Sequence, residues 1–217
     1  PSMAGKKVSI EFDGVYMDSE VYLNGTLLGR HPYGYTGFAL DLSSRVHTDG
    51  TPDVLAVKVR NQVPSSRWYS GSGIYRDVRL VVTEPAHVTR QGVQVTTPDL
   101  ANTIKSGYAT MRVATTAVSE QSDVQADVVS TVKDARGQVV GTGTAHTALT
   151  SQPRTASVDV RIDRPALWSV DRPELYTVDT EVRVGGRVVD TVSTRTGLRY
   201  FAFDPNSGFS LNGVEMK

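Results

Sequence analysis

The chain has 217 residues, which is enough for one large or two ordinary domains that each bury a core. Its 23 Lys and Arg residues balance 23 Asp and Glu residues, so we expect neither nucleic acid nor an anionic membrane as a partner. The absence of cysteine excludes disulfides and thiolate metal sites, and it leaves the compartment open. No apolar run approaches the roughly 20 residues that span a bilayer, and residues 1–7 lack a signal peptide's apolar core, so we expect a soluble chain.

The first part of the sequence predicts short strands joined by tight turns. Asn24-Gly25 stands between two apolar runs and is typical of a two-residue β-hairpin. Phe38, Leu40 and Leu42 occupy alternate positions, which predicts a strand with one face toward a core. Because Tyr33-Gly34-Tyr35 comes just before this strand, we expect it to form a packed turn and not an exposed platform of rings.

The composition of the chain changes near residues 84–87. Most aromatic residues precede this point, whereas Thr, Val and Asp dominate from residue 88 to about residue 199. We therefore predict two domains of different character, over residues 1–86 and 87–199, followed by a hairpin linker over residues 200–217.

The second segment has the period of half-buried antiparallel strands. Apolar and polar residues alternate over residues 124–132 and 178–184, and residues 134–137 and Gly185-Gly186 supply hairpin turns. Its length of about 110 residues suits an immunoglobulin-like sandwich. No stretch of ten or more residues carries a helical stripe, so the predicted fold class is all-β. The prolines around Trp168 predict an extended crossing in which this ring belongs to the core.

Residues 67–78, with the sequence RWYSGSGIYRDV, are the densest segment in residue types that bind ligands. Sugars stack their C–H faces on aromatic rings and accept hydrogen bonds at their hydroxyls, so arginine beside Trp and Tyr suits a saccharide. A dinucleotide-binding loop is not indicated, because it needs a third glycine and a following helix, and a strand is predicted over residues 78–82. The same context excludes a nucleophile elbow. A purely structural role, including an Arg76-Asp77 pair, stays open at this point.

No catalytic or metal-binding constellation is indicated. Seven glutamates are scattered along the chain, and we expect them on solvated strand faces and turn ends: Glu11, Glu20, Glu84, Glu120, Glu174, Glu181 and Glu215. Four histidines lack the spacing that would place two on one metal ion: His31, His47, His87 and His146. We therefore assign no catalytic residue, no metal and no cofactor to this chain.

Several motifs, taken in order, resemble glycoside hydrolase family 2, the β-galactosidase group. Residues 21–35 (VYLNGTLLGRHPYGY) and 68–78 (WYSGSGIYRDV) are similar to its N-terminal jelly-roll, or galactose-binding-like, domain. Residues 167–176, with LWS and PELY, resemble its immunoglobulin-like domain. Residues 197–213, with GLRYF and GFSLNG, resemble the junction with its catalytic barrel. The resemblance covers essentially the whole chain, and the ordered set of motifs is specific.

The resemblance implies a jelly-roll sugar-binding domain over residues 1–86 that lacks its first strands, and an immunoglobulin-like sandwich over residues 87–199. Residues 200–217 would then lead to a (β/α)₈ barrel that this chain does not contain. In the family both catalytic carboxyls lie on that barrel, so we expect no glycosidase activity from this chain alone.

The resemblance also implies a loop that contributes to the subsite for the non-reducing sugar. Carried over by position, Arg67 is the best candidate for a sugar contact, with Ser66 and Trp68 next. Some β-galactosidases of the family have an aspartate near the position of Ser66, so this chain departs from them in how sugar hydroxyls would be recognised.

Three functions from different classes are consistent with the sequence. The first is the non-catalytic N-terminal part of a retaining β-galactosidase, which would bind a β-galactoside only together with the barrel; β-glucuronidases and β-mannosidases share the same domain order. The second is a stand-alone carbohydrate-binding module, and the third is a structural pair of adhesion-type sandwiches. A hairpin at residues 208–213 favours the first function, because it suits the base of a barrel and has no use in an isolated lectin.

Overall fold

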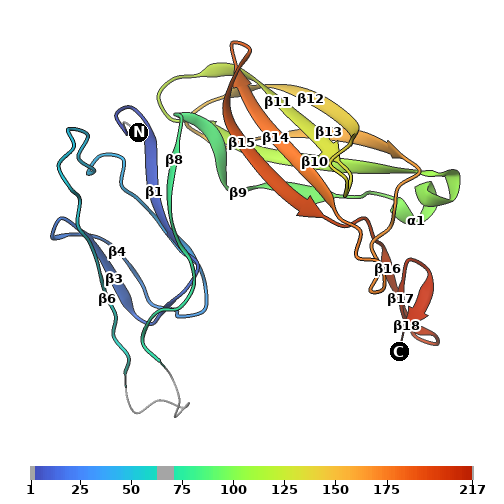
Figure 1. Ribbon diagram of the computed structural model, residues 1–217, viewed down its shortest axis with the longest axis horizontal. Helices are drawn as coiled ribbons and strands as arrows, with labels where there is room; N and C mark the ends of the chain where they lie inside the picture. Colours follow the sequence, from blue (N-terminus) through green and yellow to red (C-terminus); the bar gives the residue numbers. More distant parts are fainter. Residues whose placement is uncertain (1–2, 63–70, 217) are drawn as a thin grey trace. The chain divides into compact units, whose positions relative to one another are not determined.

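The protein is described by a computed structural model that covers residues 3–62 and 71–216 (Figure 1). The chain forms two compact units, Pro1–Glu84 (unit 1) and Pro85–Lys217 (unit 2), and each is described by itself. Nearly all of the regular structure is strand, which confirms the all-β fold class. Within the described residues, no helix is long and apolar enough to cross a membrane.

Unit 1 consists of two three-stranded antiparallel sheets and one short strand pair. The sheets have the strand orders β5-β1-β8 and β4-β3-β6, and β2 pairs with β7. The strands are β1 (Lys7–Phe12), β2 (Val15–Tyr16), β3 (Ser19–Leu23), β4 (Thr26–His31), β5 (Phe38–Asp41), β6 (Leu55–Lys58), β7 (Gly73–Ile74) and β8 (Val78–Thr83). Asn24 and Gly25, both with positive φ, connect β3 to β4, which confirms the predicted hairpin.

The core of unit 1 lies between these two sheets. Alternate residues of β1 point inward and are buried, as are alternate residues of β3, because side chains along a strand leave it on opposite faces. The core cluster is Val8, Ile10, Phe12, Val15, Val21, Leu23 and Leu42. Phe38 and Leu40 of β5 pack against it, as the alternation of the sequence predicted.

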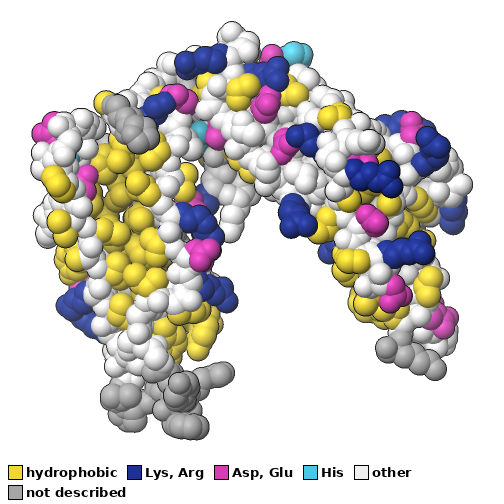
Figure 2. All heavy atoms as spheres, in the orientation of Figure 1, with side chains coloured by type: hydrophobic (Ala, Val, Ile, Leu, Met, Phe, Trp, Pro, Cys, Tyr) yellow, Lys and Arg dark blue, Asp and Glu magenta, His cyan; other side chains and the backbone are white. Residues whose placement is uncertain are grey.

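The core of unit 1 is uncovered along β8. Val78, Leu80 and Val82 stand opposite buried residues of β1, so they point to the same face of the sheet, yet all three are exposed. Among the described strands none pairs with the outer edge of β8. Figure 2 shows hydrophobic side chains gathered on a face of this unit.

Unit 2 is built from long antiparallel strands in two sheets. The orders are β13-β10-β9 and β12-β11-β14-β15. The strands are β9 (Ala86–Thr96), β10 (Tyr108–Ser119), β11 (Val124–Lys133), β12 (Val139–Leu149), β13 (Arg154–Asp163), β14 (Tyr176–Val184) and β15 (Arg187–Thr196). The hairpins β11–β12 and β14–β15 confirm the turns predicted at residues 134–137 and Gly185-Gly186.

The inward-facing residues of both sheets form the core of unit 2. Val128 and Val132 of β11 and Val178 and Val182 of β14 are fully buried, as are Ser130 and Thr180 on the same faces, and the residues that alternate with them are partly exposed. The sequence missed one short helical segment, α1 (Leu100–Thr103) with the 3₁₀ turn η1 (Ile104–Ser106). It escaped detection because one turn is too short to show a helical period.

A small three-stranded sheet completes unit 2. Its strands are β16 (Phe201–Asp204), β17 (Gly208–Leu211) and β18 (Val214–Met216), so the hairpin predicted at residues 208–213 is confirmed. Asn212 at the β17–β18 turn exchanges hydrogen bonds with the backbone of Tyr200, and its side-chain amide donates to the Trp168 carbonyl oxygen at 2.9 Å. The Trp168 ring is partly buried and lies against Gly197, with the Arg199 guanidinium 5.3 Å from its centroid.

Candidate functional site

The three residues predicted to contact sugar, Ser66, Arg67 and Trp68, lie outside the described residues. The second half of their segment is described, because Gly73 and Ile74 form β7 and residues 78–83 form β8. A strand therefore follows the glycines, as the sequence predicted over residues 78–82, and not the helix that a dinucleotide loop or a nucleophile elbow needs. Residues 71–75 of this segment line a pocket.

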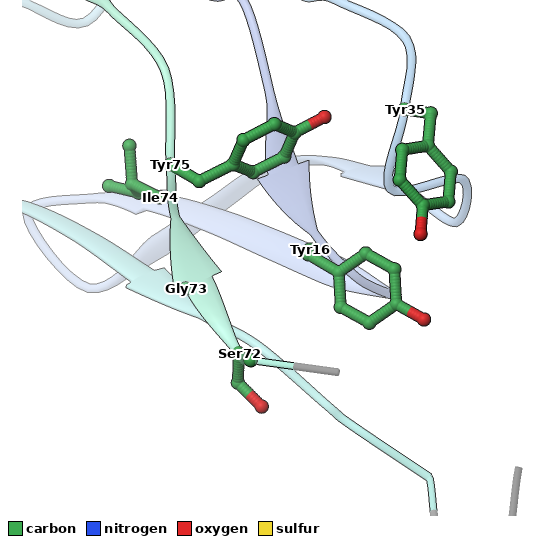
Figure 3. Close-up of a pocket in the computed structure, with 7 residues that line it drawn as sticks. Tyr16, Tyr35, Ser72, Gly73, Ile74 and Tyr75 are labelled. Atoms are coloured by element: carbon green, nitrogen blue, oxygen red, sulfur yellow. The ribbon is translucent and has the colours of Figure 1, made fainter. Parts of the chain in front are cut away.

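The pocket lies in unit 1 and has a volume of about 340 Å³. Three segments that are distant in sequence supply tyrosines to it: Tyr16 from β2, Tyr35 from the β4–β5 connection and Tyr75 from the residue after β7 (Figure 3). The remaining lining residues are Gly71, Ser72, Gly73 and Ile74. We call this set the tyrosine pocket.

Two glycines fix the positions of the pocket's rings. A Cβ on Gly34 would stand 2.4 Å from Cδ2 of Tyr16, and a Cβ on Gly14 would stand 2.6 Å from Cζ of Tyr75. Each ring therefore lies directly against backbone that only glycine leaves free. The Tyr75 hydroxyl also donates to the Gly34 carbonyl oxygen at 2.8 Å, which links the β2–β7 strand pair to the β4–β5 connection.

The tyrosine rings contact one another at their edges. The ring centroids of Tyr16 and Tyr35 are 5.5 Å apart and those of Tyr35 and Tyr33 are 5.6 Å apart, both in T-shaped geometry. Tyr33, Tyr35 and Tyr75 are each about half exposed. The prediction of a packed turn at Tyr33-Gly34-Tyr35 is therefore wrong for its two rings, since only Gly34 is buried.

Among the described residues, no carboxylate, lysine or arginine lines the tyrosine pocket. The Arg76 guanidinium lies outside it, 5.3 Å from the centroid of the Tyr75 ring. The proposed Arg76-Asp77 pair is not what the structure records, because Asp77 and Asp13 both pair with Arg79. Ring faces, tyrosine hydroxyls and backbone groups can bind a neutral, hydroxylated ligand, so the pocket suits a sugar ring.

A second cluster lies on the outer face of the β4-β3-β6 sheet, around Glu20 of β3. The Glu20 carboxylate lies 3.3 Å from Arg30 and 3.2 Å from Arg60 through Oε1, and 3.4 Å from Lys58 through Oε2. The Tyr22 hydroxyl donates to Oε2 at 2.5 Å. This hydrogen bond, opposed by burial and aided by the three cations, lowers the pKa of Glu20 from its ordinary value.

Glu20 corrects the expectation that the glutamates lie on solvated faces. Its side chain is 4% exposed, because the long side chains of Arg30, Lys58 and Arg60 cover it. The sequence could show that Glu20 and Tyr22 share the face opposite the core. It could not show which residues on the neighbouring strands meet them, since that depends on strand register.

Three of the four histidines each contact a polar or aromatic side chain, and His87 lies within hydrogen-bond distance of the Pro85 carbonyl oxygen. His47 pairs with Asp53, His146 pairs with Asp127, and the His31 ring stacks on Phe38. Within the residues that the structure describes, no group of three or more His, Asp or Glu side chains could hold a metal ion. Neither cluster in unit 1 has the donor set of a metal site.

The sequence profile of the glycosyl hydrolases family 2 matches residues 87–199, more than half of the chain. The chain belongs to glycoside hydrolase family 2. The resemblance noted in the sequence is therefore confirmed. The solved structure of a glycosyl hydrolase family 2 member from Bacteroides cellulosilyticus superposes with a TM-score of 0.92 at 32% identity, over 99% of this chain and 29% of that one.

Two curated relatives that carry different names match nearly the whole of this chain. The β-galactosidase BoGH2A of Bacteroides ovatus is 42% identical over 217 residues, which cover 99% of this chain and 25% of that protein. A β-glucuronidase of Formosa agariphila is 30% identical over 232 residues, covering 98% of this chain and 24% of that protein. The family 2 chain thus spans about a quarter of the length of these relatives.

Proposed function

We propose that this chain is the non-catalytic N-terminal part of a family 2 glycosidase, and that the longer enzyme is a retaining β-galactosidase. Membership of family 2 and the 42% identity with a protein named as a β-galactosidase support this proposal. In it, a (β/α)₈ barrel carries both catalytic carboxyls, and the chain alone hydrolyses no glycosidic bond. Unit 1 is the jelly-roll sugar-binding domain, and residues 87–199 are the immunoglobulin-like sandwich.

The tyrosine pocket is the observation that best supports sugar binding by unit 1. It joins Tyr16, Tyr35 and Tyr75 into one neutral, ring-lined surface directly beside residues 71–75. Rings held against glycine backbone lose little freedom when a ligand binds, which favours stacking on a sugar face. In this proposal the same region includes Arg67, Ser66 and Trp68 as contacts to the sugar.

Kinetics of the longer enzyme test this role. Removal of one ring of the pocket, in Tyr35→Ala, should lower kcat/KM by about five-fold, since the contact of such a ring with a sugar contributes about 1 kcal/mol. Arg67→Ala should lower it by about ten-fold or more, because charge-assisted hydrogen bonds are stronger. Tyr108→Ala in unit 2 is the control and should leave kcat/KM unchanged. Wild-type kinetics in both unit 1 variants, with unchanged melting temperatures, would reject the proposal for this region.

Calorimetry separates the proposal from a stand-alone carbohydrate-binding module. The pocket is formed entirely by unit 1, which is the observation that favours the module. We expect no heat of binding when the chain alone is titrated with galactose or lactose at millimolar concentration, because a shallow half-site contributes too little free energy. Specific binding abolished by Tyr35→Ala would favour the module instead.

The identity of the sugar is tested on the longer enzyme. The relatives include a protein named as a β-glucuronidase as well as one named as a β-galactosidase. The higher identity, 42% with the protein named as a β-galactosidase against 30% with the one named as a β-glucuronidase, favours the galactoside. A higher kcat/KM for aryl β-glucuronides than for aryl β-galactosides would overturn this assignment.

A further inference from the structure

The cluster around Glu20 carries more positive charge than its one carboxylate balances. Arg30, Lys58 and Arg60 converge on Glu20, so three positive charges meet one negative charge within 3.4 Å. Within the described part of the chain, Glu20 is the single carboxylate at ion-pair distance from these three side chains. The chain as a whole has no net charge, so this excess of two positive charges is a local property of this face of unit 1.

Strand register holds the three cations together. Arg30 of β4 and Lys58 of β6 are the direct cross-strand partners of Glu20 on either side of β3, and Arg60 follows β6. The Arg60 backbone N–H donates to the Met17 carbonyl oxygen at 3.1 Å, which fixes the strand beyond Lys58. Like charges on neighbouring strands repel each other, and the buried carboxylate beneath them offsets that repulsion.

The upper side of the three cations is open. Each cationic side chain is more than half exposed, while the carboxylate that they share is almost completely covered. Glu20 thus occupies the inner side of the guanidinium and ammonium groups and leaves their outer N–H groups to solvent. An incoming carboxylate would find donors already placed on three adjacent positions, and guanidinium groups match its geometry with two parallel hydrogen bonds.

The rest of this face suits a carbohydrate chain better than a compact ion. Tyr22 lies two residues from Glu20 on the same face, and its cross-strand partners Leu27 and Ala56 are exposed. A ring and small apolar side chains beside donors can take the C–H faces of sugars that follow an acidic unit. We name Arg30, Lys58, Arg60 and Tyr22 above Glu20 the basic face.

We propose that the basic face binds the carboxylate of an acidic carbohydrate chain, with Arg30, Lys58 and Arg60 as the binding residues and Glu20 as the residue that positions them. The carbohydrate nature of the ligand rests on the proposed function, whereas the anion site rests on the cluster alone. The site is separate from the neutral tyrosine pocket and would hold a chain at a charged unit while the pocket takes a neutral one.

The test uses the 217-residue chain and a short oligomer of galacturonic acid, titrated at about 20 mM and about 200 mM salt. We expect measurable binding at low salt that weakens with added salt, and no binding of a neutral galactan oligomer. The double variant Lys58→Gln/Arg60→Gln should weaken binding by about ten-fold or more. The matched control is Arg112→Gln/Arg161→Gln, which removes two exposed arginines of unit 2 that each pair with one aspartate. It should leave the affinity unchanged.

Glu20→Gln distinguishes positioning from simple attraction. Removal of this negative charge makes the face more positive, so attraction alone predicts tighter binding of the oligomer. If Glu20 positions the cations, binding becomes weaker despite the added positive charge. Arg60→Lys, which keeps the charge and loses the planar fork, should also bind more weakly than wild type. These comparisons are made between variants whose melting temperatures show that they are folded.

Three results would overturn the proposal: no binding by the wild-type chain, an equal loss in both double variants, or tighter binding by Glu20→Gln. Binding of a DNA duplex as tight as that of the oligomer would also overturn it, because the site would then read charge without carbohydrate. Tyr35→Ala should not alter binding of the acidic oligomer. A longer enzyme without glycosidase activity would overturn the proposed function and leave this anion site standing.

Discussion

Ile10 of β1 and Leu80 of β8 are direct cross-strand partners whose side chains leave the sheet on the same face. Ile10 is 6% exposed, whereas Leu80 is 53% exposed. The hydrophobic core of unit 1 therefore stops between two adjacent strands, and the inner face of β8 is apolar surface in contact with water. Such continuous apolar surface is uncommon on a folded protein.

This difference in exposure predicts that truncation to alanine lowers the free energy of unfolding by different amounts at Ile10 and at Leu80. Ile10→Ala should lower the free energy of unfolding by about 2–5 kcal/mol, because it leaves a cavity in packed core. Leu80→Ala should lower it by about 1 kcal/mol or less, since much of the removed surface is already hydrated. Urea unfolding of both variants measures the difference. Equal losses would mean that the inner face of β8 is covered in solution.

Crowding by one methyl group should disturb the tyrosine pocket. Gly34→Ala would place its Cβ 2.4 Å from the Tyr16 ring, and Tyr16 must move away from Tyr35. In the longer enzyme we expect kcat/KM to fall by about five-fold, as for loss of one ring contact. Gly29→Ala is the control, because its Cβ meets only the flexible end of Leu40 in the core. A fall of the same size in the control would assign the effect to general destabilisation.

The stability contributed by Glu20 should depend on pH. Its pKa is lowered in the folded chain, chiefly by the Tyr22 hydrogen bond, so its ionised form is stabilised by folding. That contribution is present above the pKa of the unfolded chain, about 4.3, and is lost as the pH falls through the lower folded pKa. The melting temperature of Glu20→Gln should lie below that of wild type at pH 7, and the gap should close as the pH falls through the lowered pKa of Glu20 in the folded chain. A gap that is constant with pH would contradict this assignment.

Tyr176 provides a test of a buried hydrogen bond in unit 2. Its hydroxyl accepts from the Ala166 backbone N–H at 2.9 Å, and burial raises the pKa of this tyrosine. Tyr176→Phe should lower the free energy of unfolding by about 0.5–1.5 kcal/mol, because the N–H loses its partner. Thermal melts of the variant and of Tyr108→Phe, whose ring keeps its contact with Arg161, measure the effect. An unchanged melting temperature in Tyr176→Phe would show that water replaces the bond.

The chain alone should hydrolyse neither aryl β-galactosides nor aryl β-glucuronides. Retaining hydrolysis needs two carboxyls about 5 Å apart on either side of the bond, and the resemblance to family 2 places both on the barrel. A fluorogenic assay at high protein concentration checks this expectation. Turnover that survives repeated purification would show that a carboxyl pair within residues 1–217 is catalytic.

The strands and their turns could be predicted because they depend on local patterns. The alternation over residues 124–132 and the pairs Asn24-Gly25 and Gly185-Gly186 are each readable within a few residues, and the structure bears all of them out. The helical turn at Leu100–Thr103 is local as well, but it is too short to carry a period.

The sites were less accessible to sequence reasoning because they depend on contacts between distant segments. Tyr16 and Tyr35 meet only when the β4–β5 connection lies over β2, and the one local signal is the glycine between Tyr33 and Tyr35. Glu20 is buried by residues 10 to 40 positions away, through a register that includes an irregularity in the β3–β4 pairing. The contact residues predicted at 66–68 remain a prediction.

Asn212 lies in the β17–β18 turn and also orients the β16-β17-β18 sheet within unit 2. Its backbone and side chain together bond Tyr200 and Trp168, so a single residue of positive φ joins the β16-β17-β18 sheet to the proline-rich crossing before β14. A force applied to this small sheet would act on these hydrogen bonds, which connect the sheet to the rest of unit 2. Three hydrogen bonds of one residue thus set the direction of this sheet relative to the crossing within unit 2.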